Sequence, residues 1–88
     1  MKIKPDFMLR SVAEQNVVVP VGNAAINFNG MINLNESGAF LWQAMTKDIT
    51  EEGLVEALLS EYELDRDLAE KDVSAFVKKM REAQLIDE

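Results

Sequence analysis

The fold of this chain is decided by the stretch Met31-Ile32-Asn33-Leu34-Asn35-Glu36-Ser37-Gly38-Ala39-Phe40-Leu41-Trp42. Apolar and polar residues alternate up to Leu34, and this alternation predicts a short strand. Asn35 is a good helix N-cap, because its side-chain oxygen can accept a hydrogen bond from an N–H group of the first turn. Glu36 suits the positive end of the helix dipole. A strand that passes directly into a helix predicts a small sheet first, with helices packed on one of its faces.

The residues before this stretch predict further short strands. The segment from Phe7 to Ala13 alternates in part, Glu14-Gln15-Asn16 is a turn signal, and the β-branched run Val17-Val18-Val19 follows. Asn29-Gly30 separates two alternating runs and is a strong hairpin signal, because both residue types tolerate positive φ. We therefore expect three or four short antiparallel strands before Asn35, with residues 1–6 as a flexible end.

Three helices are expected after the sheet, each beginning at a polar cap. The first begins after Asn35, and Thr50 and Asp65 are the expected caps of the second and third. The third helix has an apolar stripe at helical spacing. Its members are Leu68, Ala69, Val73, Phe76, Val77 and Met80. Leu85-Ile86 are then expected to pack back on the core, so the sequence predicts an α+β fold.

Composition limits the size, the location and the partners of the protein. With 88 residues the chain is expected to be one domain, residues 1–88, with a modest core. No apolar run approaches the ~18 residues of a membrane span and no signal-type segment is seen, so we expect a cytoplasmic protein without membrane contact. Residues 48–88 carry five basic and thirteen acidic groups. This acidic half disfavours nucleic acid as a partner, because nucleic-acid binding needs cationic surface.

The residue types that usually carry catalysis or bind metals are missing or badly placed. There is no His and no Cys, no Ser lies in a Gly-x-Ser-x-Gly elbow, and the four glycines are too far apart for a phosphate loop. The acidic residues Asp65, Asp67, Glu70 and Asp72 lack the Gly and the terminal Glu of an EF-hand loop, so helix caps and solvated surface explain them better than Ca²⁺. We therefore expect no catalytic residue, no metal site, no cofactor and no enzymatic activity.

Several short motifs follow one another from about residue 7 to residue 86. They are Leu34-Asn35-x-x-Gly38-x-x-x-Trp42, Ile49-Thr50, Leu58-Leu59-x-x-Tyr62, Asp72-Val73-x-x-Phe76-Val77 and Leu85-Ile86. Their order and spacing together resemble the PqqD family, the stand-alone recognition elements of ribosomally synthesised and post-translationally modified peptides (RiPPs). Two differences from the family leave open whether the pathway is pyrroloquinoline quinone synthesis or another. They are Thr46-Lys47-Asp48 in place of a frequent Asp-Gly, and a longer segment from Gly22 to Gly30.

The resemblance implies a fold and a function. The fold is winged-helix-turn-helix-like, an N-terminal three-stranded antiparallel sheet followed by three α-helices. Members of the family bind the leader of a precursor peptide by β-strand addition beside the third strand, in the cleft against the third helix. They present it to a modifying enzyme, often a radical SAM protein. The resemblance therefore implies a peptide chaperone or adaptor whose partners are a precursor peptide leader and a modifying enzyme.

The residues themselves are compatible with such a site, because an open sheet edge has unpaired N–H and C=O groups that an extended peptide can bond. The expected edge is Met31, Ile32, Asn33 and Leu34. The expected apolar wall is Val73, Phe76, Val77 and Met80, and the basic cluster that would attract acidic leader residues is Lys78, Lys79 and Arg81. Core packing is the simpler explanation for the wall and for Trp42, and complementing the helix dipole is the simpler one for the cluster. Ile32→Pro is expected to weaken leader binding, because it removes a ladder donor.

Two other functions stay open on the sequence. A winged-helix DNA-binding regulator fits the fold, but the mixed charge of the third helix does not suit a recognition helix. The other alternative is a structural subunit that self-associates through its own strand edge, because an open edge can pair with a second copy. The sequence does not distinguish a monomer from a homodimer.

Overall fold

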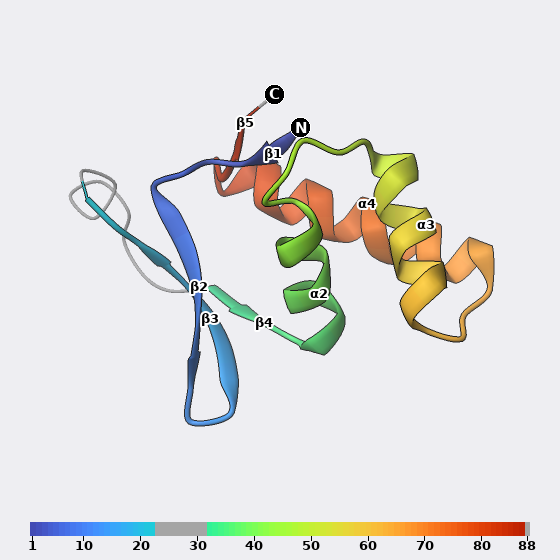
Figure 1. Ribbon diagram of the computed structural model, residues 1–88, viewed down its shortest axis with the longest axis horizontal. Coiled ribbons are helices and arrows are strands. Elements are labelled where there is room, and N and C mark those ends of the chain that lie inside the picture. The colour runs from blue at the N-terminus through green and yellow to red at the C-terminus, as the bar shows by residue number, and fades with distance from the viewer. Residues whose placement is uncertain (23–31, 88) are drawn as a thin grey trace.

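The computed structural model of the protein describes residues 1–22 and 32–87. The elements, in chain order, are β1 (Lys2–Ile3), β2 (Phe7–Val12), β3 (Gln15–Pro20), β4 (Ile32–Leu34), α2 (Glu36–Ala44), α3 (Glu51–Glu61), α4 (Arg66–Glu82) and β5 (Ile86–Asp87). β2, β3 and β4 form an antiparallel sheet in that order, and the three helices lie to one side of it (Figure 1). This arrangement confirms the predicted α+β fold.

Ala13 and Glu14 form the turn between β2 and β3. Val12 pairs with Gln15, so the loop has two residues, and both have positive φ, 51° for Ala13 and 67° for Glu14. This backbone is of the type I′ kind, whose twist matches that of the two strands, although Asn-Gly is its usual sequence. The predicted turn at Glu14-Gln15-Asn16 is wrong, because Gln15 and Asn16 already belong to β3.

β3 is the central strand, and one of its faces carries the core. Val18 is fully buried and pairs with Leu9 of β2 and Ile32 of β4. Phe7, Leu9 and Ile32 are half-buried against the same core. Because side chains alternate across a strand, Leu34 shares this face with Ile32. The core therefore lies between this face of the sheet and the helices.

Two of the three expected helix caps are formed. The Asn35 side chain accepts a hydrogen bond from the Gly38 N–H at 2.8 Å, and the Thr50 hydroxyl accepts one from the Gly53 N–H at 3.0 Å. Asp65 occupies the N-cap position of α4, but its side chain makes no capping hydrogen bond. The start of α2 is thus held directly against the end of β4, which positions the first turn of this helix beside the sheet edge.

One face of α4 is buried in the core. Its buried residues are Ala69, Val73, Phe76, Val77 and Met80. They confirm the predicted stripe except at Leu68, which is 48% exposed, because successive residues are turned by about 100° around a helix. Trp42 of α2 is 2% exposed, and it is a core residue as predicted.

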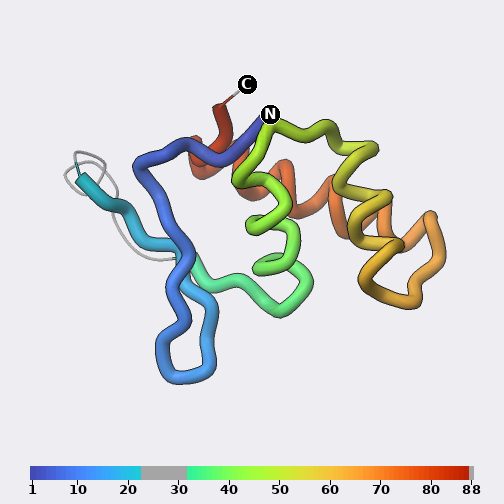
Figure 2. Tube along the Cα trace, in the orientation of Figure 1, coloured from blue at the N-terminus to red at the C-terminus, as the bar shows by residue number. Residues whose placement is uncertain are grey.

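The two ends of the chain lie side by side and pair as β1 and β5 (Figure 2). Ile3 is 7% exposed, and its N–H donates to the Met45 carbonyl at 2.8 Å. The prediction of a flexible end at residues 1–6 is therefore wrong for the first three residues, because Ile3 belongs to the core. Leu85 and Ile86 are buried, which confirms that they pack back after α4. No helix of the described chain has the length and apolar character to cross a membrane.

Candidate functional site

β4 is an edge of the three-stranded sheet. One side of β4 pairs with β3, and within residues 1–22 and 32–87 no strand pairs with its other side. The backbone N–H and C=O groups on such a side are available to another strand. β4 is therefore the candidate edge that the sequence predicted.

The hairpin register shows which residue of β4 presents these groups. Val12 and Gln15 flank the two-residue turn, and residues in these positions form a hydrogen-bonded pair. The backbone N–H and C=O of Gln15 therefore point to β2. By alternation, those of Asn16 and Val18 point to β4. They pair there with Leu34 and Ile32. The N–H and C=O of Asn33 therefore point to the open edge.

This register corrects the expectation for Ile32→Pro. The N–H of Ile32 points to β3, so proline at this position would break the bonds between β3 and β4 rather than remove a donor from the open edge. Asn33→Pro is the change that removes the outward donor. Met31, together with the predicted Asn29-Gly30 hairpin, lies outside the described residues.

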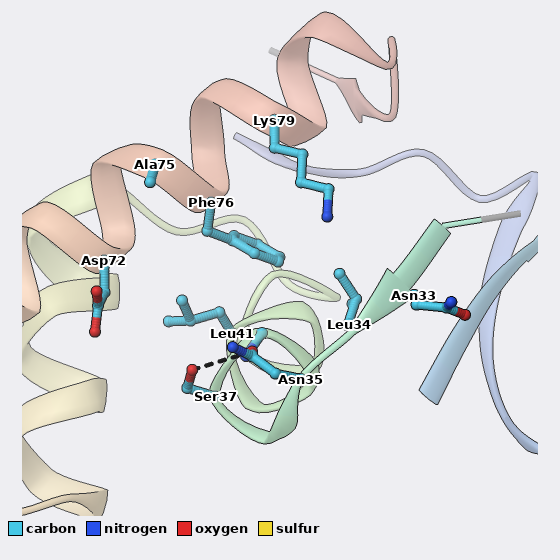
Figure 3. A pocket seen from close by; sticks show the side chains of 10 residues that line it. Asn33, Leu34, Asn35, Ser37, Leu41, Asp72, Ala75, Phe76 and Lys79 are labelled. Atoms are coloured by element: carbon cyan, nitrogen blue, oxygen red, sulfur yellow. Dashed lines mark hydrogen bonds between the residues drawn. The ribbon is translucent and has the colours of Figure 1, made fainter. Parts of the chain in front are cut away.

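A cleft of about 390 Å³ lies along this edge, between β4, the first turns of α2 and one face of α4 (Figure 3). Its lining residues are Asn33, Leu34, Asn35, Ser37, Gly38, Leu41, Asp72, Ala75, Phe76 and Lys79. Leu34, Leu41 and Phe76 are all less than 10% exposed and form an apolar floor, with the Phe76 ring lying between α4 and β4. An open strand edge beside an apolar cleft can bind an extended peptide, because the edge bonds its backbone and the cleft takes alternate side chains.

Gly38 allows α2 to begin close to β4 at one end of the cleft. A Cβ atom at this position would lie 3.0 Å from Asn35 Oδ1 and 3.4 Å from Leu34 Cβ. The same Asn35 oxygen accepts hydrogen bonds from the Gly38 N–H and from the Ser37 hydroxyl. A larger residue would therefore press on the cap that positions the first turn of α2.

Two charged side chains stand at the ends of the α4 wall. Asp72, Ala75, Phe76 and Lys79 are spaced i, i+3, i+4 and i+7, so they share one face of the helix. In Figure 3, Asp72 lies at one end of this row, and the Lys79 side chain extends from the other end towards β4. Among the residues that the structure describes, neither side chain takes part in an ion pair. The cleft thus has an acidic end and a basic end.

The structure brings part of the predicted peptide-binding set together. The members that line the cleft are Asn33, Leu34, Phe76 and Lys79. Ile32 lies next to them on β4 and is half-buried against the core. The described part of the predicted edge, residues 32–34, and one residue from each predicted α4 group therefore meet at one place.

Three residues of the predicted apolar wall lie elsewhere. Val73, Val77 and Met80 are at most 1% exposed, and none of them lines the cleft. They belong to the buried core cluster at other positions around α4 than the cleft face, so core packing explains them. Of the four residues of the predicted wall, therefore, only Phe76 belongs to both the core and the cleft.

The basic cluster is divided in the same way. Lys78, Lys79 and Arg81 are all exposed, but only Lys79 lines the cleft. Lys79 is three residues after Phe76 and seven after Asp72, which places it on the cleft face. Lys78 is turned by about 100° from that face.

Six lining residues were not among the predicted binding residues. They are Asn35, Ser37, Gly38, Leu41, Asp72 and Ala75. The helical spacing of Asp72 and Ala75 with Phe76 is visible in the sequence. What the sequence lacks is the position of β4 relative to α4, and this position decides which face of the helix borders the open edge.

A second hollow lies between α3 and α4 and is lined by charged residues, including Arg66 and Glu70. Arg66 donates a hydrogen bond to Glu56, and its guanidinium lies 3.8 Å from Glu70. The hydrogen bond and the charge of Glu56 raise the pKa of Arg66 above its ordinary value. Arg66 is therefore already paired with Glu56 and Glu70, and only helix residues line this hollow, so it is a weaker candidate than the cleft beside the open strand edge. Nowhere in the described part of the chain do three His, Cys, Asp or Glu residues gather to hold a metal ion.

A family model described as "Coenzyme PQQ synthesis protein D (PqqD)" matches residues 15–86. The chain belongs to the PqqD family. The match spans β3, β4, α2, α3 and α4, so the cleft of this PqqD-family protein lies wholly within it. No curated protein matches the chain.

Two solved structures have a fold similar to that of this PqqD-family protein. One is described as "TbiB1 in Complex with the TbiA(beta) Leader Peptide"; its TM-score is 0.76 at 21% identity, and the alignment covers 99% of this chain and 95% of that one. The other is described as "Lasso peptide synthetase B1 complexed with the leader peptide". Its TM-score is 0.72 at 23% identity, with 96% of this chain and 93% of that one covered. The fold is therefore shared over nearly the whole length of each chain.

Proposed function

We propose that this protein binds the leader of a ribosomally synthesised precursor peptide in the cleft between β4 and α4, and presents it to a modifying enzyme. The observation that carries the proposal is an open strand edge beside an apolar cleft in a PqqD-family chain. The two proteins of similar fold are described as leader-peptide complexes, which supports the same role here.

The leader would add as one further strand on β4. Asn33 supplies an N–H donor and a C=O acceptor to one residue of the leader, and these bonds depend little on sequence. The leader residues opposite Ile32 and Leu34 then point into the cleft, because these two residues face the core side of the sheet. Affinity would come from the backbone pairing together with burial of these side chains against the apolar floor.

The role needs no catalytic residue in this chain. The modifying enzyme carries the chemistry, and this protein acts as a cofactor-free adaptor in the cytoplasm, where precursor peptides are synthesised. A radical SAM enzyme is the proposed class of partner, on the resemblance of the motifs to the PqqD family. The chain would work by raising the local concentration of the precursor at that enzyme.

The proposal is tested by NMR titration of the ¹⁵N-labelled protein with leader peptides encoded by small open reading frames near its gene. We expect a leader to bind with micromolar or tighter affinity and to shift the amide signals of Asn33, Leu34, Phe76 and Lys79. The amide of Asn33 should also become protected from hydrogen exchange, because its N–H gains a partner. A scrambled leader of the same composition is the control.

Other results would exclude the proposal. If no leader binds, even with the partner enzyme present, and precursor modification proceeds equally well without this protein, the adaptor role fails. Retardation of DNA at low salt would favour the regulator instead. If the molecular mass in solution doubles as the protein concentration is raised, and the Asn33 amide signal shifts without any peptide, self-pairing of β4 would be favoured.

A further inference from the structure

We propose that the cleft selects the charge pattern of its peptide, along a strand that pairs antiparallel with β4. The preferred segment would carry a basic, an apolar and an acidic residue at alternate positions, in that order from N-terminus to C-terminus. This inference rests on the proposed leader-binding function and adds the class of peptide segment that the site prefers. It comes from the positions of Asp72 and Lys79 relative to β4.

The direction follows from the order of the cleft residues along β4. In Figure 3, β4 runs from the side of Lys79 towards the side of Asp72. A strand that pairs antiparallel with β4 runs the opposite way, so its N-terminal part lies near Asp72 and its C-terminal part near Lys79. Antiparallel pairing suits Asn33, because its outward N–H and C=O can both bond one residue of the incoming strand.

The spacing follows from the geometry of α4 and of a strand. Asp72 and Lys79 are separated by about 10.5 Å along α4 at a rise of about 1.5 Å per residue. Inward-facing residues of a strand recur at intervals of about 6.6 Å, so two of them with one between span about 13 Å. The long Lys79 side chain, which extends towards β4, can cover the difference. A basic and an acidic residue four positions apart therefore match the two ends of the cleft.

The central position of the pattern is apolar. The peptide residue opposite Leu34 points into the cleft, where Leu41 and Phe76 form the floor. Ala75, the only small side chain that α4 contributes to the lining, leaves room above this floor. The two residues between the three inward positions face the opposite side of the sheet, and the cleft places no demand on them.

The test uses two blocked peptides with the same composition and opposite order. The forward peptide contains Lys-Thr-Leu-Thr-Glu and the reversed peptide contains Glu-Thr-Leu-Thr-Lys, each between Gly-Ser ends, and affinity is measured from the amide shifts of ¹⁵N-labelled protein. We expect the forward peptide to bind about threefold to tenfold more tightly, since two partly exposed charge pairs replace two like-charge contacts. The preference should decrease with added salt.

A charge exchange in the cleft supplies the decisive comparison. Asp72→Lys combined with Lys79→Glu keeps the net charge and should reverse the preference between the two peptides. The matched control, Asp67→Lys combined with Lys78→Glu, changes exposed residues of the same helix outside the cleft and should leave the preference unchanged. Circular dichroism establishes that each variant is folded.

Three results would overturn the inference: equal binding of the two peptides, tighter binding of the reversed one, or no binding of either. An equal change of the peptide preference in the cleft exchange and in the control exchange would also overturn it, because the preference would then arise from the electric field of the whole helix. The leader titration separates these results from failure of the proposed function. A leader that binds at Asn33 with an affinity insensitive to the cleft exchange leaves the function in place and removes only the charge pattern.

Discussion

The two edges of the three-stranded sheet show how differently unpaired strands can be placed in one small protein. β2 is six residues long and ends in a tight turn, and its Met8 and Val12 side chains are 40% and 56% exposed. β4 is three residues long, passes into α2 through a helix cap, and borders the cleft whose other wall is α4. Length and exposure alone would favour β2 as the site for a partner. A strand edge therefore becomes a candidate binding site where a helix supplies a second wall.

The largest expected effect on leader affinity comes from proline at Asn33, the outward-facing position of the β4 edge. Asn33→Pro removes the outward N–H of β4 and puts the ring where the leader backbone would lie, so affinity should fall at least about tenfold, or about 1.4 kcal/mol. Ser11→Pro is the matched control, because alternation from the paired Val12 turns the Ser11 N–H away from β3. We expect Ser11→Pro to leave the affinity unchanged in titration calorimetry.

The opposite result would reverse the comparison between the edges. If Ser11→Pro abolishes leader binding and Asn33→Pro does not, the leader pairs with β2. Denaturant unfolding of both variants shows whether a loss of affinity merely reflects a loss of stability. Ile32→Pro, which breaks the ladder to β3, should lose more stability than either of them.

The wall that α4 adds to the β4 edge is tested at Phe76. Phe76→Leu keeps an apolar side chain but removes part of the floor, and we expect affinity to fall about fivefold, or about 1 kcal/mol, from the lost burial. Unfolding free energy should fall by about 1–2 kcal/mol as well, because Phe76 also packs in the core. Met8→Leu is the control on the β2 side, and it should change neither quantity. A leader affinity equal to that of the parent would show that Phe76 lies outside the bound surface.

The basic cluster is expected to give a smaller effect, confined to one residue. Lys79→Ala should weaken binding of an acidic leader about twofold to fivefold at low salt, since an exposed ion pair contributes about 0.2–1 kcal/mol. Lys78→Ala, on the neighbouring position outside the cleft, should leave the affinity unchanged. In about 1 M salt the difference should disappear, because the Debye length is then only about 3 Å. Equal losses in the two variants would assign the effect to the general charge of α4.

The turn of the β2 edge should affect stability without affecting binding. Ala13→Asn with Glu14→Gly installs the residues that the observed positive φ angles favour, and we expect the free energy of unfolding to rise by about 0.5–1 kcal/mol. The leader affinity should be unchanged, since this turn lies outside the cleft. Chemical denaturation and calorimetry measure the two quantities. A changed affinity would mean that the hairpin contributes to the site.

The sequence predicted most of the features that depend on neighbouring residues. Asn35 and Thr50 form the caps expected of them, because a cap involves a side chain and a backbone N–H only three residues away. The apolar spacing of α4 located its buried face, with Leu68 as the exception. The strand before Asn35 was also predicted, and it is the strand that borders the cleft. The order of the motifs indicated the PqqD family, which the family model confirms.

Features that join distant residues could not be predicted in this way. Ile3 and Ile86 pair across the whole chain, and no local pattern in a two-residue strand indicates its partner. The turn between β2 and β3 was predicted at the wrong residues, because Ala13 and Glu14 lack the usual Asn-Gly signal. The orientation of Asn33 depended on that turn, because the turn determines which residues of β3 bond to which neighbour.

By itself, therefore, the sequence determined the order of a small antiparallel sheet followed by three helices, the family, and the stripe of α4 that must be buried. These follow from side-chain chemistry acting over a few residues. Only the tertiary structure decided that Phe76 and Lys79 border the open edge, while Met80 lies in the core and Lys78 lies outside the cleft. The physical reason is that each residue of a helix is turned by about 100° from the last, so the residues that can meet a ligand depend on where β4 is packed.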